Sequence, residues 1–493
     1  MGPRRGGPPR RGRRVDRMDG PSTPLSPTSR HLLGLGYAAL GGTGLVLALL
    51  IGYGLTAEAP LVGLVPPLVL VVGALGLLTR PSPVVALTAV LGSSAILLTG
   101  ETGVSVLEVV FGLAAMGFLA VWVLHAMAAG AGVIRSGTDL AVALWCTAGI
   151  VGGVVLGVLF GGDPYDFRAD IQAALFLPFY FPIKEAVRTA QRGPLLFLML
   201  FVFLGMFAAI SNTLTLRAQL AEATAVYEIV DVRVAGGMMQ ISAAILMSLA
   251  ALAVPQKRLP RLALLLSLAV LMVGLVTGKS RAYWVAVALG VALLGVLFRG
   301  PDRRRLGLFL TVGVLGVVVV AVALVGDQLS LIGAGAIDRL NSLSGAGRDV
   351  SLVNRFVETQ AALDRIVRNP ILGHGWGTQI TYYSLVDYGT THWAFMHNGY
   401  VALWFKLGVW GLGLMAFAWF TSLFRGVRVA WARPLPAAER ALLIGCVSSL
   451  AVFSITAITS NPFSIMDQML FVALLLGSIN GVVQRRRLAA VPS

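Results

Sequence analysis

The sequence has little charge for its length. Only 12% of its 493 residues are Asp, Glu, Lys or Arg, and the mean hydropathy is +0.84. A water-soluble globular protein carries about 25% charged residues, and so few charges cannot cover the surface of a chain this large. Most of that surface must therefore face lipid, which excludes a set of ordinary soluble domains.

Cysteine and the common catalytic motifs are also scarce. The two cysteines, Cys146 and Cys446, both lie in apolar runs, which excludes a disulfide framework and a cysteine-based metal cluster. No GxxxxGK[ST] or GxSxG motif occurs, so ATP-driven transport and serine hydrolysis have no sequence basis. The spacing of His374, His392 and His397 matches no usual zinc pattern. We therefore expect no metal and no cofactor.

Long apolar runs dominate what is present. A bilayer core about 30 Å thick needs about 20 apolar residues in a helix. Runs of suitable length occupy residues 32–55, 60–78, 84–100, 104–128, 139–161, 171–187, 195–211, 238–255, 262–278, 282–298, 306–325, 397–424, 441–460 and 464–483. We expect an all-α polytopic membrane protein with about 14 transmembrane helices. The segment 171–187 is the weakest, because it contains Pro178 and Pro182.

The net charge of +16 comes from arginines clustered between the apolar runs. Such clusters indicate anionic lipid and the positive-inside rule rather than nucleic acid, whose partners carry a basic stripe. Residues 1–30 hold eight arginines among Gly, Pro and Ser and are predicted to form a disordered basic cytoplasmic tail. With this tail inside, the joins containing Arg135, Arg188 and Arg485 also fall on the inner side. Both termini are therefore predicted to be cytoplasmic in a multi-pass protein of the cell membrane.

The apolar runs are joined closely enough to form one membrane domain, residues 31–484, followed by a cytoplasmic tail at 485–493. The large extracytoplasmic loop is expected at 326–396. Within it, residues 351–368 place apolar and charged side chains with helical spacing, with the apolar ones near one face. This pattern predicts an amphipathic helix at the membrane surface, ended by Asn369-Pro370.

Several arginines break the charge rule by lying on the expected outer side, and four of them are candidate ligands for an anion: Arg168, Arg233, Arg281 and Arg355. A guanidinium can bind phosphate oxygens two at a time. His397 begins a helical run at the same edge and can take a proton from an alcohol near neutral pH. Each residue alone also fits a structural role, as a snorkelling arginine or a hydrogen-bonded histidine. Together they suggest an extracytoplasmic site for a phosphorylated lipid.

His397-Asn398 is followed, after nine residues, by Gly408-Val409-Trp410-Gly411. This resembles the H[NSQ]-x9-GxxG signature of the O-antigen ligase and polymerase family. The segments 233–237, 280–284, 354–356 and 369–375 also look like that family's span starts and external loop, so the likeness covers roughly residues 160–425.

The resemblance implies an inverting, metal-independent glycosyltransferase of the GT-C type. Such enzymes take a glycan from undecaprenyl pyrophosphate at the outer face of the membrane and pass it to a glycan, lipid or protein acceptor. It implies that His397 activates the acceptor hydroxyl and that Arg233 and Arg281 bind the pyrophosphate, with Arg355 carried over more weakly. Arg168 is a further candidate for pyrophosphate binding because of its position on the outer side. Asn398, Gly408 and Gly411 are expected to support the base, the two glycines through close packing of two helices.

Two other functional classes stay open beside a ligase or polymerase. A transporter or flippase for a lipid-linked sugar predicts charge at mid-membrane depth and symmetric halves. The apolar runs are almost free of charge, with Glu108 and His125 near the ends of theirs, and show no internal repeat. A peptidoglycan-type glycan polymerase is a related alternative, against which the histidine signature argues. Between ligase and polymerase we lean slightly to polymerase.

Overall fold

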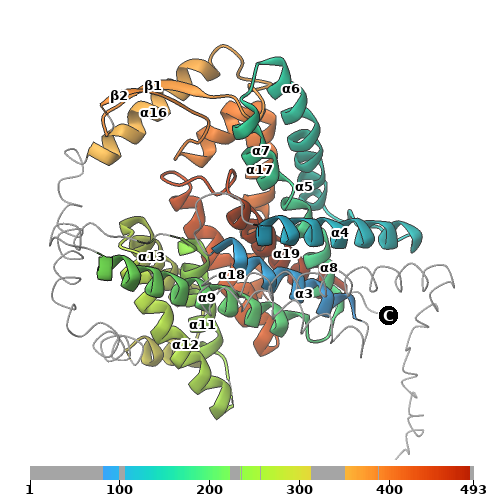
Figure 1. The fold of residues 1–493 in the computed structure, drawn as a ribbon. Helices are drawn as coiled ribbons and strands as arrows, with labels where there is room; N and C mark the ends of the chain where they lie inside the picture. The colour runs from blue at the N-terminus through green and yellow to red at the C-terminus, as the bar shows by residue number, and fades with distance from the viewer. Residues whose placement is uncertain are drawn as a thin grey trace, which may run out of the picture.

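The computed structural model describes residues 82–98, 106–222, 234, 236–255, 257–311, 350–386, 388–432 and 434–488. The predicted tail at 1–30, the predicted spans 32–55 and 60–78, and Arg233 lie outside these residues. So does the part of the predicted external loop before residue 350. Figure 1 shows the fold.

In chain order the elements are α3 (Pro83–Ser93), η2 (Ser94–Leu98), α4 (Val106–Ala128), α5 (Gly137–Thr147), η3 (Ala148–Gly152), α6 (Gly153–Leu159), α7 (Pro164–Ala174), η4 (Leu177–Phe179), α8 (Tyr180–Thr189), α9 (Gly193–Glu222), α11 (Met238–Ala253), α12 (Arg258–Thr277), α13 (Arg281–Leu297), α16 (Val350–Ile366), β1 (Ile380–Ser384), β2 (Gly389–Trp393), α17 (Gly399–Ala432), α18 (Ala437–Thr456) and α19 (Met466–Leu488).

The prediction of an all-α membrane protein is confirmed. Across the described residues, seven helices are long and apolar enough to cross a bilayer: α4, the continuous run α5–η3–α6, α9, α12, α17, α18 and α19. The helices at Pro83–Leu98, Met238–Ala253 and Arg281–Leu297 are apolar but shorter. The strands found in this part of the chain are β1 and β2, which pair antiparallel with Ile380 opposite Trp393.

The segment 171–187 is not the single helix that its apolar run predicts. Asp163 caps α7 by accepting a hydrogen bond from the Tyr165 amide at 2.9 Å, so this helix begins earlier, at Pro164. The chain then passes through the short 3₁₀ turn η4, which contains Pro178, before α8 begins. A proline lacks the amide that a continuous helix needs, which explains the interruption.

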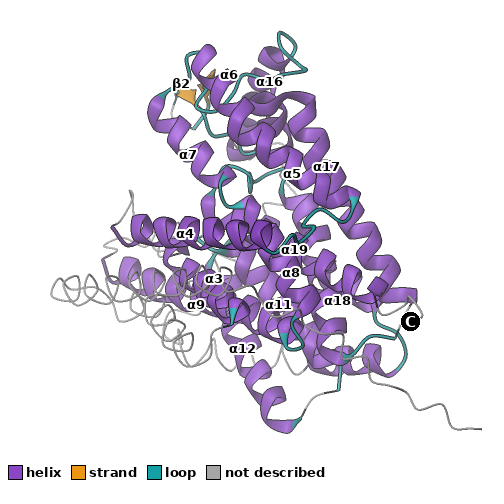
Figure 2. Ribbon diagram, turned by 90° about the vertical axis from the view of Figure 1, so that its right-hand side faces the viewer, coloured by secondary structure: helices purple, strands orange, loops and turns teal. Residues whose placement is uncertain are grey.

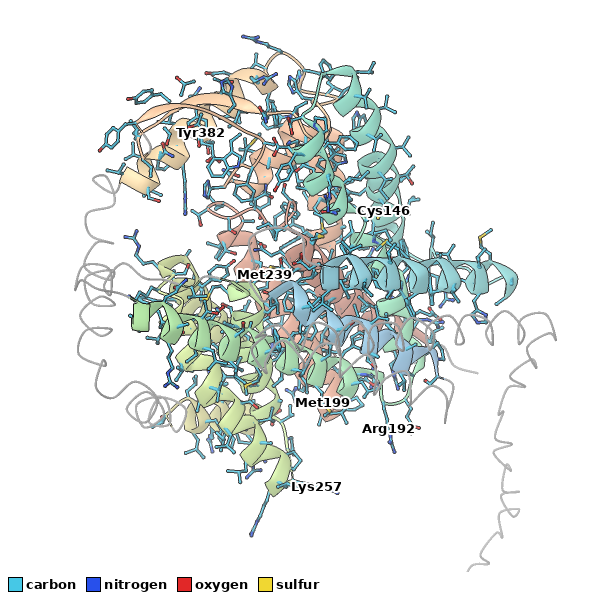
Figure 3. The ribbon with its side chains drawn as sticks, viewed as in Figure 1. Cys146, Arg192, Met199, Met239, Lys257 and Tyr382 are labelled. Carbon is cyan, nitrogen blue, oxygen red and sulfur yellow. The ribbon has the colours of Figure 1, made fainter. Side chains whose placement is uncertain are left out.

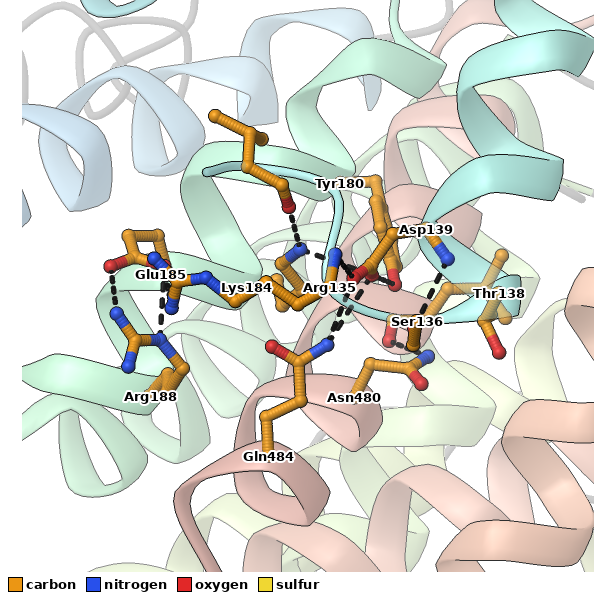
Figure 4. A network of polar contacts seen from close by, with 12 residues as sticks. Arg135, Ser136, Thr138, Asp139, Tyr180, Lys184, Glu185, Arg188, Asn480 and Gln484 are labelled. Carbon is orange, nitrogen blue, oxygen red and sulfur yellow. Dashed lines mark hydrogen bonds and ion pairs between the residues drawn. The ribbon is translucent and has the colours of Figure 1, made fainter. Parts of the chain in front are cut away.

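Segments predicted to lie on the inner side contact one another through ion pairs. The Lys184 ammonium lies 3.0 Å from the Asp139 carboxylate, and Arg135 pairs with Glu185 at 3.5 Å (Figure 4). At the ends of α18 and α19, Arg485 pairs with Glu439 at 3.2 Å. Arg485 also donates to the Val187 and Ala190 carbonyls, at 3.3 and 2.8 Å, so these contacts join four predicted inner segments at one end of the molecule.

The opposite end is a cap made of α16, β1 and β2 over α6, α7 and the start of α17 (Figures 1 and 2). Figure 3 shows Tyr382 of β1 in this cap, while Arg192 and Lys257 lie at the far end of the molecule. The segments predicted to be outside and the arginine-rich joins predicted to be inside thus lie at opposite ends of the molecule. That the cap is extracytoplasmic, with both termini cytoplasmic, stays a prediction.

Candidate functional site

The cap holds a histidine–carboxylate pair. The Nδ1 atom of His397 lies 2.8 Å from Oε2 of Glu358, and the backbone amide of His397 donates to Oε1 of the same carboxylate at 2.5 Å. The Glu358 side chain is 1% exposed and the His397 side chain 31% exposed. The buried carboxylate therefore holds Nδ1 of a partly exposed ring, and Nε2 is the ring nitrogen that this carboxylate does not bind.

Glu358 reaches this position because of the face that α16 buries. The sequence predicts an apolar face that includes Phe356 and Val367, yet these side chains are 67% and 78% exposed. The buried positions instead recur every fourth residue, at Asn354, Glu358, Ala362 and Ile366. The helix was predicted correctly. The burial of Asn354 and Glu358 was not predicted, and it arises because these two polar side chains find partners inside the cap.

Those partners are specific. Asn354 accepts a hydrogen bond from the Leu385 amide at 2.8 Å through Oδ1, which ties α16 to the end of β1. Glu358 binds His397 as described. A buried polar group is stable only when it is hydrogen-bonded, so these two contacts fix the rotation of α16 about its axis.

The start of α17 fixes the position of His397. Asn398 caps this helix, since its Oδ1 accepts from the Val401 amide at 3.2 Å. The Gly399 amide donates to the Ala457 carbonyl at 2.8 Å, which anchors the helix start to the loop after α18. The rings of Phe395 and Trp393 stand edge-on to the imidazole, with centroids 5.3 and 6.4 Å away. Asn398 is therefore a helix cap beside His397, and its role in supporting a catalytic base stays a prediction.

Gly408 supports the site in a way that the sequence did not predict. Its φ of 66° and ψ of −171° interrupt α17, and a Cβ placed there would lie 2.0 Å from the Ile371 carbonyl oxygen. The expected close packing of two helices is therefore wrong at this glycine, which breaks a helix against a loop. Gly411 likewise faces its own helix, where an added Cβ would meet the Leu407 Cβ at 2.2 Å.

The loop after α16 occupies the break. The amides of His374 and Gly375 donate to the Phe405 and Lys406 carbonyls at 2.8 Å each. Beyond the break, the Val409 amide donates to the Pro370 carbonyl at 3.0 Å. The hydrogen bonds that the helix loses are thereby replaced, as a buried backbone requires.

A buried ion pair ties this junction to α7. The Lys406 ammonium lies 2.7 Å from Oδ2 of Asp170 and also donates to the Thr378 carbonyl at 2.8 Å. The same Asp170 oxygen accepts from the Gly377 amide at 2.9 Å. Lys406 contradicts the expectation that the apolar runs are almost free of charge, and so does the partly buried Asp467 at the start of α19, which binds Gln240.

The His374 side chain is packed among aromatic rings in the junction between the loop and α17. Its ring stacks on Phe405 with centroids 4.8 Å apart, and burial lowers its pKa below the usual value. No hydrogen-bond partner for Nδ1 is found in the described part of the chain. The ring therefore stays neutral and packs as an aromatic group in the junction.

The four arginines predicted to bind phosphate differ in how near they lie to the His397–Glu358 pair. Arg355 lies one turn before Glu358 on α16 and donates to the Thr459 carbonyl at 3.2 Å. Arg281 is the first residue of α13, and the Tyr283 hydroxyl beside it is hydrogen-bonded to Ser460.

Arg355, the start of α17 and the start of α13 therefore all meet the loop after α18, which includes Ala457, Thr459 and Ser460. Arg168 is exposed on α7, and no contact joins it to His397 within the described residues. Arg233 lies outside those residues. The structure thus brings together Arg355, Glu358 and His397, with Arg281 at the neighbouring helix start.

Sequence reasoning missed Glu358, Asp170 and Lys406. Glu358 was assigned to the charged, solvent-facing side of an amphipathic helix. A carboxylate four residues from the buried Asn354 could have been matched with His397 only by knowing that the helix packs under the histidine. Lys406 is visible as a lone cation in an apolar run, which is a signal for a buried partner.

Residues 266–416 match the model of the O-antigen ligase family. The matched stretch begins inside α12 and ends inside α17, so it contains Arg281, Arg355, Glu358 and His397. A comparison of the chain with curated proteins finds no match. The family match thus covers the histidine–carboxylate pair and the helix break that holds it.

Proposed function

We propose that this chain transfers a glycan from an undecaprenyl-pyrophosphate-linked donor to an acceptor hydroxyl. The proposal starts from the match of residues 266–416 to the O-antigen ligase family and from the helices long and apolar enough to cross a membrane. The family is glycosyltransferase-like and acts in surface polysaccharide assembly. The observation that carries the proposal is the His397–Glu358 pair in the cap, at 2.8 Å. Reaction at the outer face of the membrane follows from the arginine pattern.

In this mechanism His397 is the general base. The Glu358 carboxylate accepts a hydrogen bond from the Nδ1–H group, which leaves the lone pair of Nε2 to take the proton of the acceptor hydroxyl. The carboxylate also stabilises the imidazolium that forms. An alcohol is a poor nucleophile, and a positioned base contributes about 10²–10⁴-fold to the rate.

The bond changes balance without a further reactant. The acceptor oxygen forms a bond to the anomeric carbon of the donor sugar, and the bond from that carbon to the pyrophosphate oxygen breaks. The electron pair leaves with the lipid pyrophosphate, and the proton of the hydroxyl resides on His397. Attack opposite the leaving group inverts the anomeric centre.

The arginines have the second task in this proposal. Charge develops on the pyrophosphate as it leaves, and preorganised cations stabilise it. Arg281, at the start of α13, and Arg355, one turn from Glu358, are the described residues that we assign to this task, with Arg233 as a further candidate. Arg168 is exposed and supports the assignment less. In this proposal arginine charge takes the place of a metal ion.

The test is reconstitution of the purified full chain with a defined undecaprenyl-pyrophosphate oligosaccharide and mass spectrometry of the products. We expect His397→Ala to lose transfer by about 10²–10⁴-fold while it binds the donor like the wild type. Arg281→Lys should weaken donor binding, because a point charge does not replace a planar fork. Near-normal turnover by His397→Ala would remove the base assignment.

The products also separate the remaining alternatives. A ladder of repeat lengths on the lipid carrier indicates a polymerase, and intact glycan on a different acceptor indicates a ligase. Movement of the lipid-linked sugar across the membrane without a new glycosidic bond would favour a transporter. Lys406 and Asp467, the charged residues inside apolar helices, are paired with Asp170 and Gln240, so they do not in themselves favour a transport path.

A further inference from the structure

A hollow of about 840 Å³ lies between the last turns of α17 and α19, at the end of these helices away from the cap. This volume is in the range of small-molecule sites, about 300–1,000 Å³. None of the residues assigned to glycan transfer lines it. Its lining combines three phenylalanines with four arginines and contains no acidic residue.

The phenylalanines form a stripe along α17. Phe417, Phe420 and Phe424 follow one another at spacings of three and four residues, which places them on one face of the helix. Their exposed fractions are 49%, 56% and 68%. The stripe thus offers an uncovered apolar wall on one side of the hollow.

The arginines follow the stripe in the same direction. Arg425 is fixed at the wall, since its Nη1 donates to Oγ1 of Thr138 at 2.8 Å. Arg486 of α19 donates to the Glu439 carboxylate at 2.6 Å. Arg428 and Arg487 are exposed, and the described part of the chain offers them no hydrogen bond or ion pair. Two guanidiniums are therefore held in place and two more are open to a ligand.

The distance along α17 from the first phenylalanine to the exposed arginine matches the thickness of one lipid leaflet. From Phe417 to Arg428, α17 rises about 16 Å at 1.5 Å per residue. Half of a hydrocarbon core is about 15 Å thick. A lipid whose chains lie on the phenylalanines therefore has its head group level with the arginines, where the guanidinium fork matches phosphate.

We propose that this hollow binds one anionic phospholipid from the leaflet that faces the arginine-rich joins. Charge decides the occupant. The four arginines repel the basic residues 1–30 and leave a zwitterionic lipid with an uncompensated cation at the site. The proposal is independent of the glycan-transfer chemistry, because the hollow and the cap share no residue.

The test uses the purified full chain in detergent, titrated with dioleoyl phosphatidylglycerol while thermal unfolding and native mass spectrometry follow lipid binding. The variant Arg428→Gln/Arg487→Gln removes the two open guanidiniums. Its matched control is Arg303→Gln/Arg304→Gln, which removes two exposed arginines of the 301–311 helix that do not line the hollow. Dioleoyl phosphatidylcholine and glycerol phosphate are titrated in parallel.

We expect phosphatidylglycerol to stabilise the wild type, with its apparent affinity weakened roughly thirtyfold in Arg428→Gln/Arg487→Gln and little changed in the control. Equal weakening in both variants would mean general attraction to an anionic surface and would overturn the proposal. Equal stabilisation of the wild type by glycerol phosphate, or by phosphatidylcholine, would overturn it as well, whatever the variants do.

Discussion

Glu358 is the residue whose replacement separates positioning from binding. We expect Glu358→Gln to lower the rate of transfer by at most the loss in His397→Ala, about 10²–10⁴-fold. The glutamine amide can donate to Nδ1, which places the imidazole proton on Nε2 and leaves no acceptor for the hydroxyl. The measurement is kcat in the reconstituted assay, with donor affinity measured beside it.

The matched variant is Glu358→Asp, which retains a carboxylate and should recover part of the rate. A merely structural Glu358 predicts a different outcome, in which Glu358→Gln loses donor binding and thermal stability as much as kcat. Unchanged kcat in Glu358→Gln would remove the carboxylate from the mechanism.

Single residues also show how far sequence alone reaches. His397 and Asn398 could be singled out because a histidine at a helix start is chemically distinctive, and Arg355 because it lies on the side where cations are rare. Glu358 could not, because its importance arises from packing between segments 39 residues apart. Long-range pairs of this kind leave no local pattern.

Among the elements, the break in α17 makes a clear prediction about Gly408. Gly408→Ala forces a side chain into a left-handed φ and against the Ile371 carbonyl, so we expect it to cost at least about 1–3 kcal/mol of stability. Gly413→Ala, in the same helix with open space around its Cβ position, should be neutral or slightly stabilising.

The measurement is the Tm of both variants in the same detergent, together with hydrogen exchange of residues 370–375. A shared Tm for Gly408→Ala and Gly413→Ala would mean that the break does not exist in solution. We expect reduced protection of the loop in Gly408→Ala alone, because its amides lose their carbonyl partners on α17.

The elements themselves were largely predictable, since apolar runs of bilayer length need no partner to be recognised. The errors have physical causes. The segment 171–187 is divided because Pro178 cannot continue a helix. The side of α16 that carries Asn354 and Glu358 is buried because these residues satisfy their hydrogen bonds inside the cap. The GxxG spacing suggested helix packing, but a positive φ cannot be read from spacing.

Across the whole molecule, Asp170 and Lys406 join α7 to α17 over a separation of 236 residues, nearly half the length of the chain. Asp170→Asn leaves the Lys406 ammonium buried without its carboxylate, which should cost about 3–5 kcal/mol. The control Asp166→Asn removes a carboxylate of the same helix that is partly exposed and binds Gln379, and should cost about 1 kcal/mol.

Thermal unfolding of the two variants checks this ordering. The double variant Asp170→Asn/Lys406→Met should recover part of the lost stability, because it removes the uncompensated charge. Equal losses for Asp166→Asn and Asp170→Asn would contradict the role of the ion pair. The arginine pattern of the sequence predicted which joins lie together at one end of the molecule. It did not predict the buried ion pair between Asp170 and Lys406.

The interruption at Gly408 has a consequence for how the protein sits in bilayers of different thickness. The piece of α17 after it, residues 409–432, is about 36 Å long and can tilt to match its lipid surroundings. The short piece before it is fastened to the cap through Phe405, Lys406 and Asp170. We therefore expect tilting of the long piece to be taken up at Gly408, so that the distance between the His397 imidazole and the Glu358 carboxylate does not change with membrane thickness.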